Sequence, residues 1–349
     1  MIHSGHERSR RGSVLMLTLW ILLFLCALAA AVGALVSARI ELAAGLRDRL
    51  VAYAAAEAGV EVARSEARRE TNAWTDALQP WSTRTAAMQD VPLGDGTFTI
   101  VHLAEDRKGG VTNAPGMGDE ESRLNLNQVT NEEVELVFRA LLREAADAEP
   151  DAAESLAASV ADWVDPDDTP RRNGAESAHY RGLPRPYDCR NGPMESLDEL
   201  LLVKGMTPRL LDRLRPFVTI YGDTRAVNLN TAGPTVLRSL AMAKPGSDGT
   251  RAGALVERIL DVRGSGQSFR SADKRVLRQA LYGPGIRAPA EQEEWVLLEW
   301  AMNHRLVSVQ SRQFCGISIG CSGRGGPVRQ RIGFVLDQQR DGVVGWHEY

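Results

Sequence analysis

The chain has 349 residues, of which 44% are hydrophobic and 25% are charged, and its formal net charge is −4 at pH 7. This globular composition excludes a disordered chain, and the length allows two core-forming units and an appendage. A net charge near zero provides no general attraction to nucleic acid, because non-specific binding requires Lys and Arg to neutralise phosphates. A nucleic-acid function would therefore need a local basic patch.

The opening segment predicts a membrane-spanning helix. No charged residue occurs from Ser13 to Ala38, and about 20 apolar residues suffice to cross a bilayer. Arg8, Arg10 and Arg11 precede the segment, so the positive-inside rule puts the first dozen residues in the cytoplasm. A secretory signal peptide is disfavoured, because its apolar region runs only about 7 to 15 residues.

The helical pattern continues beyond the membrane edge. Charged residues alternate with apolar or alanine positions, which are Ile40, Ala43, Ala44, Leu50, Ala54, Ala58 and Val62. No proline occurs before Pro80, so nothing in the pattern ends the helix early. We expect one helix to run from the bilayer into the soluble part.

Two separate regions of the body predict β-strands. Residues 95–108, "DGTFTIVHLAEDRK", lie between glycines and are rich in β-favouring residues. The C-terminal segment from Arg305 shows alternation broken by glycines, which is typical of an antiparallel meander. The block from Glu120 to Met302 is rich in helical patterns. If both β regions share one core, a helical insertion divides the sheet.

The insertion contains a repeated pattern. "ESRLNLNQVTNEEVELVFRALL" and "RAVNLNTAGPTVLRSLA" share L/V-N-L-N followed by a helix. Asn127 and Thr231 lie near the two helix starts, where short polar side chains accept backbone N–H bonds. We expect Thr130 to cap the first helix, with Glu133 in the capping-box position.

Hairpin-like segments follow each copy of this pattern. "SLDELLLVKGMTPRLLDRLRPFV" has helix–turn–helix spacing around Gly205 and resembles half of a helix-hairpin-helix. In hairpins that bind DNA, two glycines expose backbone N–H groups to a phosphate. Thr207 occupies the place of the second glycine here, and the second copy has "KPGSDG" instead. A packing role is therefore favoured over contact with DNA.

A cluster of carboxylates marks a candidate cation site. Four acids lie within seven residues and a fifth follows, which are Asp162, Asp165, Asp167, Asp168 and Glu176. Ca²⁺ takes six to eight oxygen ligands from flexible loops, although EF-hand spacing is absent. In the alternative interpretation, Asp162 and Asp165 cap or end a helix, and Asp167 and Asp168 stay solvated in a turn.

The remaining reactive residues predict no catalytic site. The four cysteines are too few for a disulfide scaffold. Cys315 and Cys321 flank "GISIG" and could close a local turn as a disulfide in an oxidising compartment, or could stay as buried free thiols. No nucleophile–base arrangement, nucleotide loop or zinc spacing is recognisable, so we expect no enzyme.

Taken with these motifs, the N-terminus resembles the type II secretion minor pseudopilin K family. The matching residues are "RSRRG" followed by "SVLMLTLW", and later the D-W-V-D-P-D run, G-A-E, P-Y, N-x-P and E-L-x-x-V-x-G. The resemblance implies cleavage by prepilin peptidase between Gly12 and Ser13 and methylation; the alternative is an uncleaved anchor. The fifth mature residue, Leu17, replaces the glutamate of major pilins, and the K type is similar in lacking that acid.

The resemblance also implies an α+β pseudopilin fold with a long N-terminal helix, an antiparallel sheet and an inserted α-helical domain with helix-hairpin-helix or SAM-like repeats. The implied divisions are a leader (1–12), a transmembrane half-helix (13–38), a periplasmic helix with the first strands (39–119), the insertion (120–302) and the C-terminal strands (303–349).

Functionally, the family implies a single-pass inner-membrane protein with a periplasmic body that caps or initiates the pseudopilus at its tip. The implied partners are minor pseudopilins of the I, J and H types, prepilin peptidase, the inner membrane and secreted substrates, without nucleic acid. A structural Ca²⁺ is implied at Asp165, Asp167, Asp168 and Glu176. The rival interpretations are a membrane-anchored DNA receptor and, ranked last, a metal hydrolase.

Overall fold

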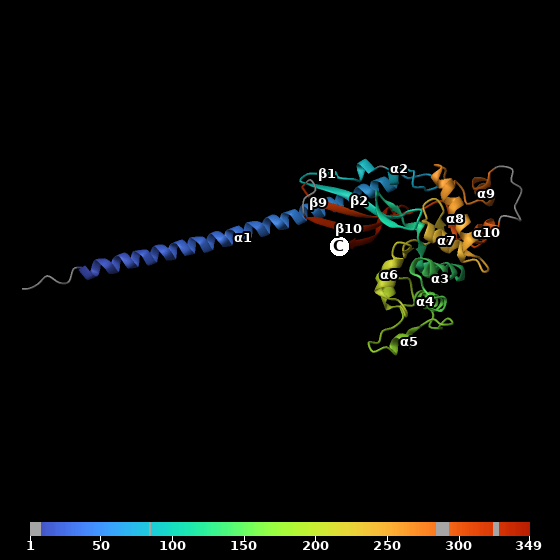
Figure 1. The fold of residues 1–349 in the computed structure, drawn as a ribbon, viewed down its shortest axis with the longest axis horizontal. Coiled ribbons are helices and arrows are strands. Elements are labelled where there is room, and N and C mark those ends of the chain that lie inside the picture. The colour runs from blue at the N-terminus through green and yellow to red at the C-terminus, as the bar shows by residue number, and fades with distance from the viewer. Residues whose placement is uncertain (1–7, 84, 284–292, 324–327) are drawn as a thin grey trace, which may run out of the picture.

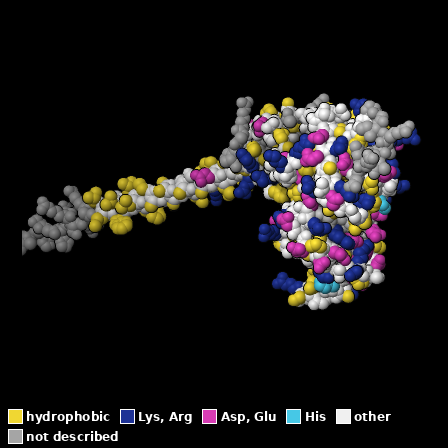
Figure 2. Space-filling view, turned by 45° about the vertical axis from the view of Figure 1, so that its right-hand side comes forward, with side chains coloured by type: hydrophobic (Ala, Val, Ile, Leu, Met, Phe, Trp, Pro, Cys, Tyr) yellow, Lys and Arg dark blue, Asp and Glu magenta, His cyan; other side chains and the backbone are white. Residues whose placement is uncertain are grey.

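One helix dominates the N-terminal part of the molecule. The computed structural model describes residues 8–83, 85–283, 293–323 and 328–349. Helix α1 (Arg8–Arg69) is continuous over 62 residues, as predicted, and Figure 1 shows it leaving the body as a long rod. From Val14 onward it is long and apolar enough to cross a membrane, by length and composition. Hydrophobic side chains cover this projecting part in Figure 2, whereas the body shows a mixture of both charges.

The C-terminal part of α1 packs on a sheet through small residues. Its buried apolar side chains are Ala52, Ala55, Ala56, Val60, Ala63 and Ala67. The approach is so close that a Cβ on Gly320 would lie 1.9 Å from the Ala52 carbonyl oxygen. A Cβ on Gly59 would lie 2.2 Å from Ser318 Oγ. Glycine in the sheet and alanine on the helix therefore set this distance.

The sheet is antiparallel and has the order β1-β2-β9-β10-β11. These strands are β1 (Val91–Leu93), β2 (Gly96–Glu105), β9 (Gln313–Ser322), β10 (Arg329–Asp337) and β11 (Gly342–Glu348), with β3 (Val111–Pro115) beside β2 and β4 (Gly118–Asp119) beside β9. Ile100 of β2 lies opposite Ser318 of β9. Because these neighbours come from opposite ends of the chain, the prediction of a sheet divided by an insertion is confirmed.

Short helical segments lie between the larger elements. α2 (Pro80–Thr83) and the 3₁₀ helix η1 (Thr85–Ala87) connect α1 to the sheet, the 3₁₀ helices η2 (Glu120–Ser122) and η3 (Leu126–Gln128) open the insertion, and η4 (Leu197–Leu202) lies within it. The sheet core contains Phe98, Ile100, Phe314, Ile332 and Phe334, packed on α1. The insertion has a separate and larger core.

The insertion consists of two halves with the same framework. The first half (residues 124–222) contains β5 (Leu124–Asn125), α3 (Glu132–Ala146), α4 (Pro150–Val164), α5 (Ser177–Arg181), α6 (Pro208–Leu214) and β6 (Val218–Thr219). The second half (residues 227–309) contains β7 (Val227–Asn228), α7 (Pro234–Met242), α8 (Gly249–Gly264), α9 (Lys274–Tyr282), α10 (Glu293–Asn303) and β8 (Val307–Ser308). In each half the first strand pairs in parallel with the last, β5 with β6 and β7 with β8.

The repeated asparagines make equivalent contacts in the two halves. Asn127 accepts from Met194 N at 2.7 Å and donates to the carbonyl oxygens of Met194 and Ile220. Asn230 accepts from Phe269 N at 2.8 Å and donates to the carbonyl oxygens of Phe269 and Val309. The repeat seen in the sequence therefore marks two structurally similar units.

Asn127, Thr231 and Thr130 do not cap the helices that follow them, contrary to the prediction. Helix α3 is capped by Asn131, whose side chain accepts from Val134 N, and Thr130 does not serve. The Thr231 hydroxyl donates a hydrogen bond to Asp119 instead. Helix α7 has Gly233 at its N-cap position and no side-chain cap. The two L-N-L-N segments instead use their side chains to hold distant backbone, which is a tertiary role that local pattern does not reveal.

Candidate metal centre

Three buried carboxylates converge at the end of α4. Asp162 lies in the final turn of α4, and Asp165 follows it at the C-cap with an extended backbone. Glu176 approaches from the loop that precedes α5. One oxygen from each carboxylate lies within 4.8 Å of the others, and all three residues are buried.

Arg171 enters the same cluster from the loop. Its backbone N–H donates to both oxygens of Asp162, at 3.1 and 3.2 Å. Its Nη1 donates to Asp162 Oδ1 at 3.1 Å and also to Asp165 Oδ2. The loop comes so close that a Cβ on Gly174 would lie 2.0 Å from Asp162 Oδ2. The glycine of the G-A-E motif is therefore required by this contact.

Three carboxylate oxygens in the cluster have no hydrogen-bond partner although they are buried, namely Asp165 Oδ1 and both oxygens of Glu176. Burial, followed by repulsion from Asp162, raises the pKa of Glu176 to about 7. Burial also raises the pKa of Asp162, against the hydrogen bonds from Arg171 that lower it. A buried charge without a partner is costly, so this arrangement favours a cation among these oxygens.

The donor set fits a hard cation. All three groups offer carboxylate oxygen, which suits Ca²⁺ and similar ions. The nearby Cys189 thiol donates to the Asp162 carbonyl oxygen at 3.6 Å, and burial raises its pKa to about 12. Without a bound metal this thiol is therefore protonated and adds no charge to the cluster.

The structure brings together two of the four predicted ligands, Asp165 and Glu176. Asp167 instead accepts from Thr169 N at 2.8 Å in an exposed turn. Asp168 accepts from Ser177 N at the start of α5, and hydrogen bonds from Ser177 lower the pKa of Asp168. Asp162, which the sequence interpretation assigned to a helix end, takes their place. Its spacing from Asp165 is the signal that could have identified it.

Aromatic residues and a lysine fix the loop that carries these acids. Trp163 and Tyr180 are buried, with ring centroids 5.2 Å apart in an edge-to-face arrangement. Tyr187 stacks on Tyr180 at 5.3 Å. Lys204 Nζ donates to the carbonyl oxygens of Asn173 and Gly174 at 3.1 Å each. The loop is therefore positioned by packing as well as by charge.

Of the two alternatives for Cys315 and Cys321, the disulfide is wrong and the free thiols are present. Both residues lie on the single strand β9, and both thiols are free. Six residues of extended strand separate their Cα atoms by about 20 Å, whereas a disulfide requires less than about 7 Å. The glycines around them mark close packing in the sheet, and the segment forms no turn.

The predicted cleavage point lies at the start of α1. The backbone of Gly12 and Ser13 is helical, and residues 1–7 of the leader lie outside the described residues. Leu17, the fifth residue after that point, is 61% exposed on the projecting helix.

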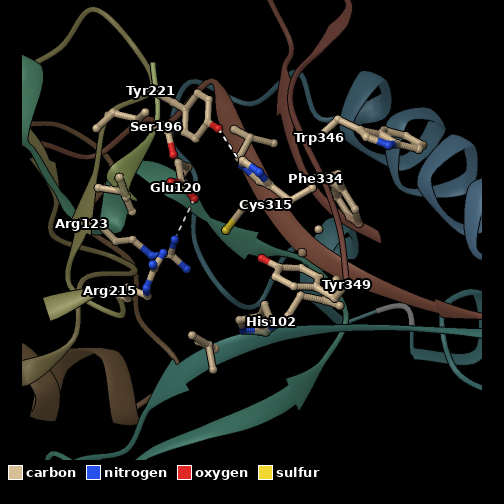
Figure 3. Close-up of a pocket in the computed structure, with 18 of the residues that line it drawn as sticks. His102, Glu120, Arg123, Ser196, Arg215, Tyr221, Cys315, Phe334, Trp346 and Tyr349 are labelled. Carbon is tan, nitrogen blue, oxygen red and sulfur yellow. Dashed lines mark hydrogen bonds and ion pairs between the residues drawn. The ribbon is translucent and has the colours of Figure 1, made fainter. Parts of the chain in front are cut away.

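A larger groove of about 610 Å³ lies between the sheet and the first half of the insertion (Figure 3). Cys315, Ile317 and Val335 line it, on the sheet face turned away from α1. Two polar pairs lie along it: Arg123 pairs with Glu120 at 3.0 Å, as Figure 3 shows, and Tyr221 Oη lies 3.1 Å from His347 Nε2. The second pair joins the insertion to β11, so the groove lies at the interface between the insertion and the sheet.

Comparison with known proteins identifies the first half of the insertion. Residues 122–223 match the family described as type II secretion system (T2SS), protein K. Type II secretion system protein K of Pectobacterium carotovorum is 42% identical over 96 residues, and that of Aeromonas hydrophila is 40% identical over 116 residues. Within residues 122–223 the chain is therefore similar to type II secretion system protein K. The family match contains all three acids of the cluster and Arg171.

The sequence alignments are local. They cover 27% and 32% of this chain, and 29% and 35% of the Pectobacterium and Aeromonas proteins, about a third of those relatives' own length. The fold likeness is wider. The crystal structure of the GspK-GspI-GspJ complex from enterotoxigenic Escherichia coli aligns with a TM-score of 0.63 at 18% identity, over 89% of this chain and 99% of the matched chain. None of these matches names a nucleic-acid-binding protein.

Proposed function

We propose that this chain is a minor pseudopilin that caps or initiates the pseudopilus of a type II secretion system. The observation that carries the proposal is the continuity of α1. One 62-residue helix is exposed and apolar at its N-terminal end and packs on the sheet at its C-terminal end. Such a helix can leave the inner membrane within a bundle of similar helices while it holds a periplasmic body. The role is structural and needs no catalytic group.

The size and position of the insertion support the tip location. Figure 1 shows the insertion at the end of the body away from the exposed part of α1. A subunit with so large a head leaves little room for another subunit directly above it. Leu17 agrees with this position, because an acid buried in the bilayer is costly unless an amine of a neighbouring subunit pairs with it.

The proposed partners are minor pseudopilins of the I, J and H types, with secreted substrates contacting the tip. The solved relative was crystallised as a complex with GspI and GspJ, which supports the first two. The test is to co-express the full chain with I-type and J-type proteins and to isolate it through a tag in detergent. We expect a stoichiometric complex. Recovery of the chain alone, from membranes that contain all three proteins, would contradict the assignment.

We also propose that prepilin peptidase cuts between Gly12 and Ser13. The arginine-rich leader and the apolar helix after it support the proposal. Co-expression with the peptidase should give a product that begins at Ser13, and Gly12→Val should block the cut. An intact Met1 in the presence of active peptidase would favour the uncleaved anchor instead.

For the insertion, we propose two copies of one hairpin-like unit and a structural divalent cation, Ca²⁺, in the first copy. The residues that would hold the ion are Asp162, Asp165 and Glu176. Support comes from their burial and from the three oxygens without partners. The bound ion would neutralise repelling carboxylates and tie the loop to the end of α4. The proposed divisions of the chain remain the leader (1–12), the spanning helix (13–38), the body (39–119 and 303–349) and the insertion (120–302).

A further inference from the structure

Arg171 hydrogen-bonds to only some of the carboxylate oxygens in the cluster. Its guanidinium takes Oδ1 of Asp162 and Oδ2 of Asp165. Asp165 Oδ1 and both oxygens of Glu176 stay without a hydrogen-bond partner. The side chain of Arg171 is 29% exposed, whereas those of Asp162 and Asp165 are 0% and 10% exposed. The arginine therefore closes one side of the cluster and leaves a set of oxygens facing inward.

The nearest carboxylate outside the cluster, Glu135, already has another arginine as its partner. Its Nε lies 3.7 Å from Glu135 Oε2. Glu135 already accepts from Arg139 Nη2 at 3.0 Å, and Arg139 also lies 3.9 Å from Glu154. Glu135 therefore has a second arginine that compensates its charge, and the shorter contacts of Arg171 are those with Asp162 and Asp165.

The formal charges of the three carboxylates and Arg171 do not sum to zero. Ligands to a metal are deprotonated, so the three carboxylates carry a formal charge of −3. Arg171 contributes +1, which leaves −2 in a buried site. An uncompensated buried charge is strongly unfavourable. One divalent ion brings the sum to zero, whereas a monovalent ion or a trivalent ion leaves one unit of charge.

We propose that Arg171 stays in place when the ion binds and that it sets the preference of the site for a divalent cation. This inference rests on the metal site proposed above. Arg171 acts as a positioning and charge-balancing residue: it orients Asp162 and Asp165 through one oxygen each, and it repels a trivalent ion more than a divalent one. If the ion instead displaced the arginine, the two kinds of ion would be affected alike by its removal.

The test compares Ca²⁺ with Tb³⁺, an ion of similar size and higher charge. The full chain in detergent is stripped with chelator, and the Kd of each ion is measured by calorimetry for wild type, Arg171→Gln, Arg171→Lys and Arg139→Gln. The Arg171→Gln substitution should raise the ratio of Kd for Ca²⁺ to Kd for Tb³⁺ by about ten- to a hundredfold. The positive charge of Arg171 repels Tb³⁺ more strongly than Ca²⁺, so its removal improves the binding of Tb³⁺ more.

The controls separate charge from structure. Arg171→Lys keeps the charge, and Arg139→Gln removes a neighbouring arginine that does not touch the cluster, so both should keep the ratio within about threefold of wild type. An unchanged ratio in Arg171→Gln would overturn the inference while leaving the metal site intact. Failure of the wild-type chain to bind either ion would overturn the site and the inference together.

A measurement on the wild-type chain decides the matter if Arg171→Gln does not fold. With ¹⁵N-labelled arginine, the Arg171 Nε–H signal, assigned with Arg171→Lys, should exchange slowly with water in the calcium-bound state. Exchange as fast as that of exposed arginines after calcium addition would show that the guanidinium has left the cluster, and would contradict the proposal.

Discussion

The two halves of the insertion share an asparagine framework but are stabilised in different ways. In the second half the chain passes from the end of α8 at Gly264 to the Phe269 contact within a few residues. In the first half the corresponding connection, from Val164 to Met194, carries the acidic loop and α5. The same structural unit therefore tolerates a long connection between its helices, as long as other contacts hold that connection in place.

The second half is fixed by the sheet and by the segment after α1. Thr75 N donates to the Val309 carbonyl oxygen at 2.8 Å. Ser268 Oγ donates to Asp76, and the Arg270 guanidinium lies 5.0 Å from the Trp74 ring centroid. The first half has the carboxylate cluster and its arginine in the equivalent connection. We therefore ascribe to the cation in one half the role that tertiary contact has in the other.

The largest effect should come from the asparagines that open each half. Asn228 is fully buried, and its Nδ2 donates to the Thr75 carbonyl oxygen, Asp119 Oδ2 and Ser311 Oγ. Asn228→Ala leaves the buried Asp119 carboxylate with one donor fewer, so it should lower the free energy of unfolding by about 3–4 kcal/mol. The matched change Asn125→Ala removes bonds to backbone groups only, namely the carbonyl oxygens of residues 221, 222 and 224 and the Asn127 N–H, and should cost about 1–2 kcal/mol. Urea denaturation measures both, and equal losses would contradict the difference in anchoring.

A smaller and local effect is expected at Gly174. Gly174→Ala places a methyl group against Asp162 Oδ2 and should cost about 2–3 kcal/mol. It should also weaken calcium binding at least tenfold, because it displaces a ligand. Gly192→Ala is the matched control in the same loop, where a Cβ meets only the Arg190 carbonyl oxygen at 3.9 Å. Similar calcium affinities for the two variants would argue against the acids as ligands.

The smallest effect concerns pH and the boundary with the sheet. Burial, together with the neighbouring Asp119, raises the pKa of Glu121 to about 7 from its ordinary value near 4.5. A carboxyl group with a raised pKa in the folded state contributes stability that is complete below about pH 4.5 and is lost as the pH rises through 7. Glu121→Gln should therefore reduce the loss of stability between pH 5 and pH 8 by about 1 kcal/mol, after allowance for partial exposure.

Thermal melts of Glu121→Gln and of Glu132→Gln, a change at an exposed position of α3, would check this effect. Each is compared with wild type at both pH values, so that contributions common to all chains cancel. If Glu121→Gln and Glu132→Gln show the same pH dependence, Glu121 does not titrate in this window.

Much of the fold could be predicted from the sequence because it depends on periodicity. The uninterrupted pattern from Ser13 past Val62 specified α1, and the two β regions specified a divided sheet. The repeated L-N-L-N indicated two related halves. These signals are local or are repeated along the chain, so they can be read without the tertiary structure.

The rest depends on contacts between distant segments. Local spacing could not show which acids are buried, because Arg171 and Gly174 return to α4 and select Asp162 over Asp167. The glycines of "GISIG" suggested a turn, yet a Cβ on Gly316 would lie 2.7 Å from the Phe334 ring, so they mark close packing. The cap of α3 was misplaced by one residue, within the usual uncertainty of helix boundaries.

The most direct test of this account is hydrogen exchange of the full chain in detergent, with calcium and with chelator. At a hundredfold excess over Kd, calcium should add about 2.7 kcal/mol of protection to openings that release the ion. Backbone amides of residues 166–193 should therefore exchange about a hundredfold faster after chelation, while those of residues 265–283 stay unchanged. Equal acceleration in the two halves, or no change in either, would contradict the claim that a cation fixes the first half and the sheet fixes the second.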